Sequence, residues 1–230
     1  MDAVILCGGL GTRLREAEPG RQKTMVEVGG RPFLDRVVGW AAGAGLRRFV
    51  LCAGYRSEEV RRHFAEGPNH AGLDFVVSEE DRPLGTAGAL ARCRALLRGK
   101  TALVVNGDSL CPLDLRAFAA FHAKRGGIAS VAAIAPGDRT DGGFVAVGAG
   151  DRVLSFSERE PGPGRRLSAG IYLLEPEFWS FISPQGPASL EKDVFPKALG
   201  RGVYAFITDA PLRDIGTPER LAEARRQVSR

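Results

Sequence analysis

Short apolar runs and helix-like segments alternate along the first 106 residues. Four runs are rich in β-branched residues, as buried strands are: AVIL at 3–6, RFVLCA at 48–53, DFVVS at 74–78 and TALVVN at 101–106. Between them we expect helices at 32–44, 57–65 and 86–97. Pro32 suits a first helical turn, Ser57 an N-cap, and Gly45 the position just past a helix end. This alternation predicts a parallel sheet joined by right-handed crossovers.

After residue 106 the strand-like runs follow one another with few helices between them. We expect a helix at 114–125 and then four strands, at 128–134, 142–148, 152–158 and 168–175. They are interpreted as the second half of one mixed sheet, with antiparallel strands at an edge. A Pro- and Gly-rich flap at 158–166, a strand at 203–208 and a helix from Pro218 complete the chain. The predicted fold class is α/β: a Rossmann-like mixed, mostly parallel sheet flanked by helices, in a single domain over 1–230.

Composition narrows the class of partner. The 230 residues carry a formal net charge of +5, which suits an anionic small molecule as well as a nucleic acid. The basic patches have no interleaved aromatic residues, so no nucleic-acid partner is expected. No apolar run approaches the ~20 residues of a membrane span, and the first residues do not resemble a signal peptide. We therefore expect a cytoplasmic protein with no membrane association; the oligomeric state is left open, a homo-oligomer included.

Cysteine and histidine spacing gives no sign of a soft-metal site. The four cysteines, at 7, 52, 93 and 111, are scattered and form no CxxC pair. Scattered thiols are typical of proteins in a reducing compartment. The three histidines, His63, His70 and His122, are separated along the chain, and we expect no histidine metal site from them.

The stretch CGGLGTRLRE, residues 7–16, places three glycines and two arginines directly after the first strand. Gly-rich backbone between a strand and a helix exposes N–H groups that cradle phosphates. The loop is not a dinucleotide fingerprint, because Leu14 stands where the third glycine belongs, nor a Walker A loop, because no glycine precedes Lys23. Arg13 and Lys23 are two fixed cations that suit a triphosphate. For the glycines alone, a tight turn with incidental arginines is an equal alternative.

Longer stretches carry a family resemblance. AVILCGGLGTRLRE…QKTMVEVGGRPFLDRVV resembles the start of the sugar-1-phosphate nucleotidylyltransferases, whose signature is G-G-x-G-T-R-[LM] followed by a lysine element. Further motifs are similar to the family's base-side loop, metal strand, two sugar-side elements and second metal motif: RPLGTAGAL, VVNGDSL, SAGIYLLEPE, SLEKDVFPKAL and LRDIGTPERLAEA. Their number and order make the resemblance specific. It implies the nucleotide-diphospho-sugar transferase fold, with a nucleotide-binding half at 1–110 and a sugar-phosphate-binding half at 111–230.

The resemblance also implies a reaction. An oxygen of a sugar 1-phosphate attacks the α-phosphorus of a nucleoside triphosphate, and pyrophosphate leaves. The nucleophile is already an anion, so catalysis needs positioning and charge rather than a general base. Arg13 is expected to hold the leaving phosphates, Lys23 to meet the α-phosphate, and Asp108 to complete the catalytic set. Asp108 and Asp214 are expected to bind Mg²⁺. A turn-forming Asp108 and a helix-capping Asp214 are the alternatives.

Binding residues follow from the same motifs. The expected nucleotide-binding residues are Leu6, Cys7, Gly8, Gly9, Gly11, Thr12, Glu80, Gly85, Thr86 and Gly107. Glu80 is placed to accept hydrogen bonds from guanine, with a solvated loop acid as the alternative. The sugar phosphate is expected at Arg159, Gly170 and Glu191. The chain departs from the family here: Ser168 replaces a frequent Asn, Arg159 replaces the Lys of a frequent E-K-P, and Thr24 replaces the Pro that usually follows the lysine. An edge-strand Ser168 and a salt-bridged flap at Arg159 remain the alternatives.

Three stretches, LCGGLGTRL, RPFL and SLEKDVFPKAL, are most similar to the short guanylyltransferases that act on D-glycero-α-D-manno-heptose 1-phosphate. That similarity implies GTP as nucleotide and GDP-heptose, a precursor of bacterial surface polysaccharide such as capsule, as product. The alternatives are a UTP-, CTP- or dTTP-dependent hexose-1-phosphate transferase, a non-catalytic nucleotide-sensing module, and a Rossmann oxidoreductase. The sensing module predicts loss of Arg13, Lys23, Asp108 or Asp214, and all four are present. The oxidoreductase requires the third glycine that the loop lacks.

Overall fold

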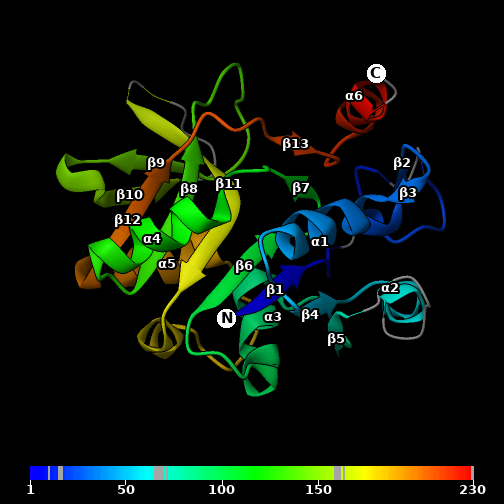
Figure 1. The fold of residues 1–230 in the computed structure, drawn as a ribbon, viewed down its shortest axis with the longest axis horizontal. Helices are drawn as coiled ribbons and strands as arrows, with labels where there is room; N and C mark the ends of the chain where they lie inside the picture. Colours follow the sequence, from blue (N-terminus) through cyan, green and yellow to red (C-terminus); the bar gives the residue numbers. More distant parts are fainter. Residues whose placement is uncertain are drawn as a thin grey trace.

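A nine-stranded sheet runs through the centre of the molecule (Figure 1). The computed structural model describes residues 1–9, 11–14, 18–64, 70, 72–157, 162 and 164–228. The strands are β1 (Asp2–Leu6), β4 (Arg48–Ala53), β5 (Asp74–Glu79), β6 (Ala102–Asn106), β8 (Ala129–Ile134), β9 (Phe144–Val147), β10 (Val153–Ser157), β11 (Arg165–Leu174) and β12 (Val203–Ile207). They lie in the order β12-β8-β11-β6-β1-β4-β5, and the β9–β10 hairpin pairs with the beginning of β11.

The strands β1, β4 and β6 are buried on both faces, which is why they are apolar without a polar alternation. In β1, Ala3 and Ile5 point into one core cluster and Val4 points into the other, and none of these side chains is exposed. The strands β5, β4, β1 and β6 are parallel neighbours, with Val4 paired to Val50 and to Val104. This confirms the predicted parallel sheet with helical crossovers.

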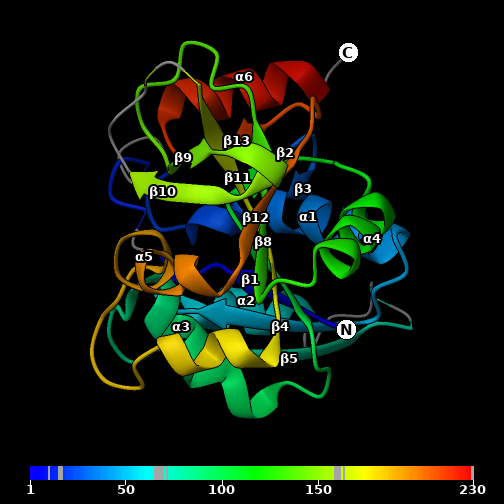
Figure 2. The same cartoon turned by 90° about the vertical axis from the view of Figure 1, so that its left-hand side faces the viewer.

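Helices cover both faces of the sheet (Figures 1 and 2). One core cluster lies under α1 (Phe33–Gly43), α2 (Ser57–Phe64), α4 (Leu115–Arg125) and α6 (Pro218–Val228). The other lies under α3 (Gly85–Cys93), α5 (Phe195–Ala198), the 3₁₀ helix η4 (Pro176–Phe181) and a π-helical turn, η5 (Leu190–Val194). Among the described residues, none of the helices combines the length and apolar character needed to cross a bilayer.

Helix ends follow the local sequence with two differences. Pro32 is the N-cap of α1, and Gly45, with φ +104°, follows its end as expected. Ser57 is not an N-cap: it is the first helical residue of α2, and its hydroxyl donates to Glu79 Oε2 at 3.0 Å. The helix predicted at 86–97 is regular only to Cys93 and continues as a 3₁₀ turn, η2 (Arg94–Leu96).

The long strand β11 changes partners along its length. Arg165–Leu167 pairs with β9, and Ile171–Leu174 pairs with β6, both antiparallel. The expected antiparallel edge exists at β9–β10, but β11 itself lies inside the sheet between β6 and β8. The register shifts between Ser168 and Tyr172, where Gly170 has φ +69°. Such a bulge bends a strand and lets it serve two neighbours, which sequence alternation did not reveal.

Two short ribbons were not predicted from the sequence. β2 (Glu27–Val28) pairs with β3 (Arg31–Pro32) just before α1. β7 (Ser109–Leu110) pairs with β13 (Arg213–Asp214), placing Asp214 opposite Ser109, and the Ile215 amide donates to the Asp108 carbonyl at 3.0 Å. The second ribbon joins residues about a hundred positions apart, and both carboxylates of the predicted metal site lie on it or beside it.

Candidate active site

A cleft opens at the carboxyl ends of β1 and β6, where α/β sheets bind their ligands. Its first cavity, of about 260 Å³, is lined by Leu6, Gly8, Gly9, Glu80, Pro83, Gly85, Thr86, Ala89, Asn106 and Asp108. Its second cavity, of about 660 Å³, is lined by Arg13, Lys23, Thr86, Asn106, Asp108, Ser109, Arg139, Asp141, Gly142, Gly143, Glu191, Asp214, Gly216 and Arg220. Thr86, Asn106 and Asp108 belong to both cavities, so Asp108 lies at their junction.

The glycine loop forms one wall of the first cavity. Gly8 lies against the Glu80 carboxylate, and a Cβ at Gly8 would stand 3.0 Å from Glu80 Oε1. Gly11 has φ +59° and packs against the Lys23 side chain, where a Cβ would lie 3.2 Å from Lys23 Cβ. Arg13 reaches the second cavity, two-thirds exposed, 3.5 Å from Asp141 Oδ2. The loop therefore presents bare backbone to one cavity and a cation to the other.

Other predicted loop residues support the loop instead of lining the cavities. Cys7 is buried, its amide donates to the Cys52 carbonyl at 2.9 Å, and burial raises the pKa of its thiol. Gly107 donates its amide to the Leu6 carbonyl at 2.8 Å, and a Cβ there would stand 3.0 Å from the same oxygen. Thr12 is exposed. These contacts fix the ends of β1 and β6 side by side.

Lys23 and Asp108 form a close ion pair across the second cavity. Nζ lies 2.5 Å from Asp108 Oδ2, with the lysine side chain 14% exposed and the aspartate 33%. Burial raises the pKa of Asp108, but the charge and hydrogen bond of Lys23, together with the Ser109 hydroxyl, outweigh it and hold that pKa below its ordinary value. The Asp108 carboxylate is therefore ionised and can bind further cations.

Gln22, which sequence reasoning missed, holds Lys23 in place. Lys23 begins the 3₁₀ turn η1 (Lys23–Met25), and the side-chain oxygen Oε1 of the buried Gln22 caps it by accepting from the amides of Thr24, at 2.6 Å, and Met25, at 3.1 Å. The side-chain amide of Gln22 donates to the Cys7 carbonyl. The lysine is thus tied directly to the glycine loop. The only sequence signal was a polar residue before the lysine element.

Asp214 lines the second cavity together with Asp108, the other carboxylate that the sequence motifs singled out. Its side chain is 6% exposed, Oδ1 accepts from the Gly216 amide at 2.9 Å, and its carboxylate pairs with Arg139 and, at 3.5 Å, with Arg220. Thr217 also has a helix-end contact, because its hydroxyl oxygen accepts from the Arg220 amide at 3.4 Å. Two carboxylates with no thiol or imidazole among the described lining residues are a hard-oxygen donor set. Such a set suits Mg²⁺, which would share these oxygens with the cations now facing them.

Three further charged residues of the second cavity were missed by sequence reasoning. Arg220, on α6, pairs with Asp141 and holds the pKa of Asp141 below its ordinary value through a hydrogen bond. Arg139 and Asp141 lie on the segment between β8 and β9. The cavity is thus lined by three guanidinium groups, those of Arg13, Arg139 and Arg220. The segment carries no family motif that was recognised, and only the position of Arg220 beside Asp214 in the sequence was a usable signal.

The base-side loop packs tightly against the sugar-side elements. Gly85 has φ +71°, and a Cβ there would stand 2.5 Å from the Ala188 carbonyl oxygen. The Thr86 hydroxyl accepts from the Leu190 amide at 2.8 Å and lines both cavities. Glu80 Oε2 accepts from the Leu84 amide at 3.2 Å. Burial raises the pKa of Glu80, although the Leu84 amide and Arg92 act in the opposite direction.

Glu191 lies at the far side of the second cavity. Its Oε1 accepts from the Tyr172 hydroxyl at 2.6 Å, and that hydroxyl lies 3.2 Å from the Ser168 hydroxyl. Burial, with the neighbouring Glu191 charge, raises the pKa of Tyr172 far above its ordinary value, so the phenol stays protonated and donates. A chain of two hydroxyls therefore orients the carboxylate. Tyr172 was not singled out from the sequence, because it reads as a core residue.

Of the predicted sugar-phosphate residues, Gly170 does not line either cavity and Arg159 is not among the described residues. Gly170 is buried, and the space a side chain would need is filled by Asn106, whose Nδ2 would be 2.5 Å from a Cβ. Gly170 therefore allows β11 to pack against β6. Arg159, the predicted phosphate ligand, lies outside the described residues.

Comparison with known proteins places the chain in a family. A model of the nucleotidyl transferase family matches residues 2–230. Mannose-1-phosphate guanylyltransferase from Mycobacterium tuberculosis is 35% identical over 224 residues, covering 95% of this chain and 62% of that protein. Thus the chain spans somewhat under two-thirds of the length of the curated relatives it matches. This α/β chain, with a glycine-rich loop beside a charged cleft, belongs to the nucleotidyl transferase family.

Solved structures agree over almost the whole chain. HddC from Yersinia pseudotuberculosis superposes with a TM-score of 0.85 at 28% identity, covering 98% of both chains. A second structure of HddC, in complex with GMP-PN, gives a TM-score of 0.81. The inositol-1-phosphate CTP transferase from T. maritima, at 19% identity and a TM-score of 0.78, shares the fold.

Proposed function

We propose that this protein transfers a nucleotidyl group from a nucleoside triphosphate to a sugar 1-phosphate and releases pyrophosphate. The observation that carries the proposal is the junction of the two cavities at Asp108, beside Lys23. The first cavity is lined entirely from within 1–110, and the second adds residues from 139 to 220. We assign nucleoside binding to the first half and sugar-phosphate binding to the second, so that the α-phosphorus is attacked where they meet.

The chain's own residues provide positioning and positive charge. A phosphate oxygen of the sugar 1-phosphate forms a bond to the α-phosphorus, and the bond from that phosphorus to the bridging oxygen of the β-phosphate breaks. Pyrophosphate leaves with the electron pair. Lys23 neutralises the α-phosphate, and Arg13 binds the leaving phosphates. Arg139 and Arg220 exchange their present carboxylate partners for substrate phosphates, because guanidinium groups bind both bidentately.

Asp108 and Asp214 would hold the divalent ion. When bound, Mg²⁺ offsets the repulsion between the two anionic substrates and stabilises the charge of the leaving group. Lys23 keeps Asp108 ionised before the ion arrives, and the Gly216 amide orients Asp214. The pairing of β7 with β13 holds the main chain of Asp214 opposite Ser109, the residue that follows Asp108.

We further propose GTP as the nucleotide and a heptose 1-phosphate of the D-glycero-α-D-manno type as the acceptor. Glu80, half-buried in the first cavity, offers a carboxylate to the N1–H and amino group of guanine. The similar guanylyltransferases, and the HddC complex with GMP-PN, support guanine. The three sequence stretches similar to heptose enzymes support the sugar; a hexose 1-phosphate with another nucleotide is the alternative. The four free, buried thiols suit the reducing cytoplasm.

A matrix of substrates tests the function. Each of GTP, ATP, UTP, CTP and dTTP is incubated with heptose 1-phosphate or mannose 1-phosphate and Mg²⁺, and the products are identified by mass spectrometry alongside pyrophosphate release. We expect GDP-heptose as the dominant product. Asp108→Asn should abolish it, whereas Asp138→Asn, on an exposed loop side chain, should not. If none of the substrate pairs yields a nucleotide-sugar, the proposed activity is overturned. If a different pair gives the dominant product, only the substrate assignment is overturned.

A further inference from the structure

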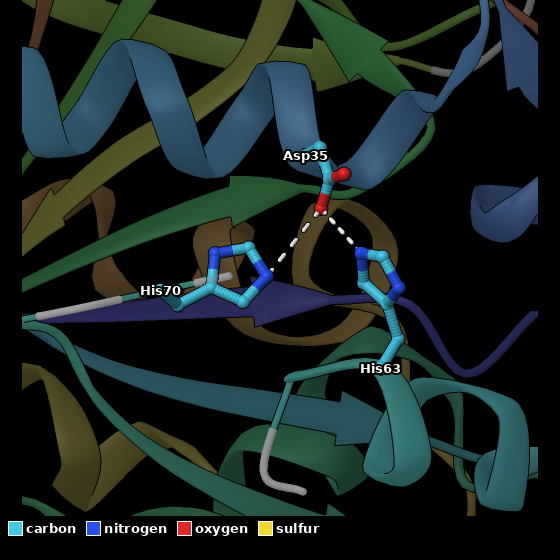
Figure 3. A group of neighbouring side chains, drawn as sticks. All are labelled: Asp35, His63 and His70. Carbon is cyan, nitrogen blue, oxygen red and sulfur yellow. Dashed lines mark hydrogen bonds and ion pairs between the residues drawn. The ribbon is translucent and has the colours of Figure 1, made fainter. Parts of the chain in front are cut away.

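Two histidines and an aspartate converge on one point between α1 and the end of α2 (Figure 3). Asp35 lies in the first turn of α1, His63 in the last turn of α2, and His70 follows shortly after. Asp35 Oδ1 lies 2.8 Å from His63 Nε2 and 3.8 Å from His70 Nε2. The histidines were expected to form no metal site because they are separated along the chain; the structure instead places His63 and His70 beside the same carboxylate oxygen.

The ligand atoms are partly shielded and preorganised. The three side chains are between 14% and 28% exposed. The His70 ring stacks on Phe64 at 4.9 Å between centroids and lies 5.1 Å from the Phe75 ring. Within the described part of the chain, the buried Nε2 atom of His70 has no hydrogen-bond partner. A buried ring nitrogen held by aromatic neighbours and aimed at a carboxylate is a polar atom still short of its partner.

The spacing fits a transition-metal ion. The three ligand atoms all lie within 4.8 Å of one another. Zinc bonds of about 2.0–2.2 Å at tetrahedral angles place neighbouring ligand atoms about 3.3–3.5 Å apart. The two measured separations lie on either side of that value, so small side-chain rotations complete a three-ligand site with water in the fourth position.

We propose that Asp35, His63 and His70 form a binding site for Zn²⁺ or a similar transition-metal ion, separate from the catalytic cleft. Two imidazole nitrogens and one carboxylate favour zinc over Mg²⁺, which prefers oxygen ligands only. None of the three is among the described residues lining the two cavities of the cleft. The bound ion clips the beginning of α1 to the end of α2.

Zinc binding by the untagged full chain tests the site. The protein is titrated with Zn²⁺ in millimolar Mg²⁺, and bound zinc is counted after desalting. The C2–H proton resonances of the three histidines are followed by NMR in the unmodified protein. We expect one zinc per chain, shifts of the His63 and His70 resonances and none of His122. At a free zinc concentration of a hundred times Kd, Tm should rise by about 5–10 °C.

Matched variants separate the site from other zinc ligands. His63→Gln and Asp35→Asn should each weaken zinc binding about 100-fold or more, since even the loss of a residue that only orients a ligand costs about 10–100-fold. His122→Gln, whose imidazole is bonded to Ser130 and Glu175, should keep full zinc affinity. If the His63 and His70 resonances of the wild-type protein do not change at saturating zinc, the proposal is overturned. Equal zinc affinity in wild type and His63→Gln would overturn it as well and leave an ordinary His63–Asp35 ion pair.

Discussion

Replacing Lys23 by Met removes one charge from the centre of the cleft while nearly keeping the side-chain length. The ammonium group contacts Asp108 Oδ2 at 2.5 Å in a pair that is 14% and 33% exposed. Loss of one preorganised charge contact costs about 100- to 1,000-fold in turnover, or about 2.7–4 kcal/mol. We therefore expect kcat of Lys23→Met to fall by about that factor. Lys197→Met, on an exposed lysine of α5, should leave it unchanged.

The same substitution leaves the Asp108 carboxylate without its partner. An exposed ion pair contributes about 0–1 kcal/mol, and breaking a fully buried one costs about 3–5 kcal/mol. For this half-shielded pair we expect about 1–2 kcal/mol of lost stability, seen as a Tm lower by about 2–8 °C. Without Lys23 competing for the carboxylate, Mg²⁺ should raise the Tm of the variant by more than it raises that of wild type.

The pH dependence of stability gives an independent check that the Lys23–Asp108 pair stabilises the fold. The folded-state pKa of Asp108 is lowered, so the stability contributed by the pair is fully present above the ordinary carboxyl value of 3.8. It is lost as the pH falls through the lower folded value. The difference in unfolding free energy between wild type and Lys23→Met should therefore shrink below pH 3.8. Turnover within threefold of wild type, or an identical Mg²⁺ response, would refute the role assigned to Lys23.

Three other predictions concern the walls of the cleft. Gly85→Ala should destabilise the fold by about 1–3 kcal/mol more than Gly186→Ala in denaturant unfolding, since both have positive φ but only at Gly85 would the added Cβ lie 2.5 Å from a carbonyl oxygen. Tyr172→Phe should raise the KM for the sugar phosphate about tenfold and leave the KM for GTP unchanged, because it frees the Glu191 carboxylate to move; equal effects on both would exclude this. The pKa of Glu80 is raised above its ordinary value of 4.5. As the pH falls, the KM for GTP should therefore begin to rise at a higher pH than it would with an ordinary carboxyl group, and Glu80→Gln should remove this pH dependence.

Strands and helices of the first half could be predicted from the sequence because each is encoded locally. The run at 3–6 is apolar on both faces. Gly45 follows the end of the helix α1 and stops it. The position of β11 inside the sheet could not be predicted in the same way. It depends on a bulge at Ser168–Tyr172 and on the contact of Gly170 with Asn106, which is remote in sequence. Local alternation carries no information about which strands become neighbours.

The candidate site divides along the same line. Arg13, Lys23, Asp108 and Asp214 lie in recognisable motifs, and the structure brings all four to one cavity. Gln22, Arg139 and Tyr172 act mainly through hydrogen bonds and ion pairs to residues at least fifteen positions away; the exceptions are the cap that Gln22 provides to its own turn and the contact between the Tyr172 and Ser168 hydroxyls. Their residue types are ordinary for a loop or a core. Only the folded chain shows which functional group each of them contacts.

The β7–β13 ribbon has a consequence during synthesis of the protein. Asp108 emerges from the ribosome about a hundred residues before the carboxylate at position 214, which the ribbon later brings beside it. A nascent or truncated chain that stops before β13 lacks one of the two proposed metal ligands, together with Arg220. On the proposed mechanism, a chain that stops before β13 therefore cannot transfer a nucleotidyl group from a nucleoside triphosphate.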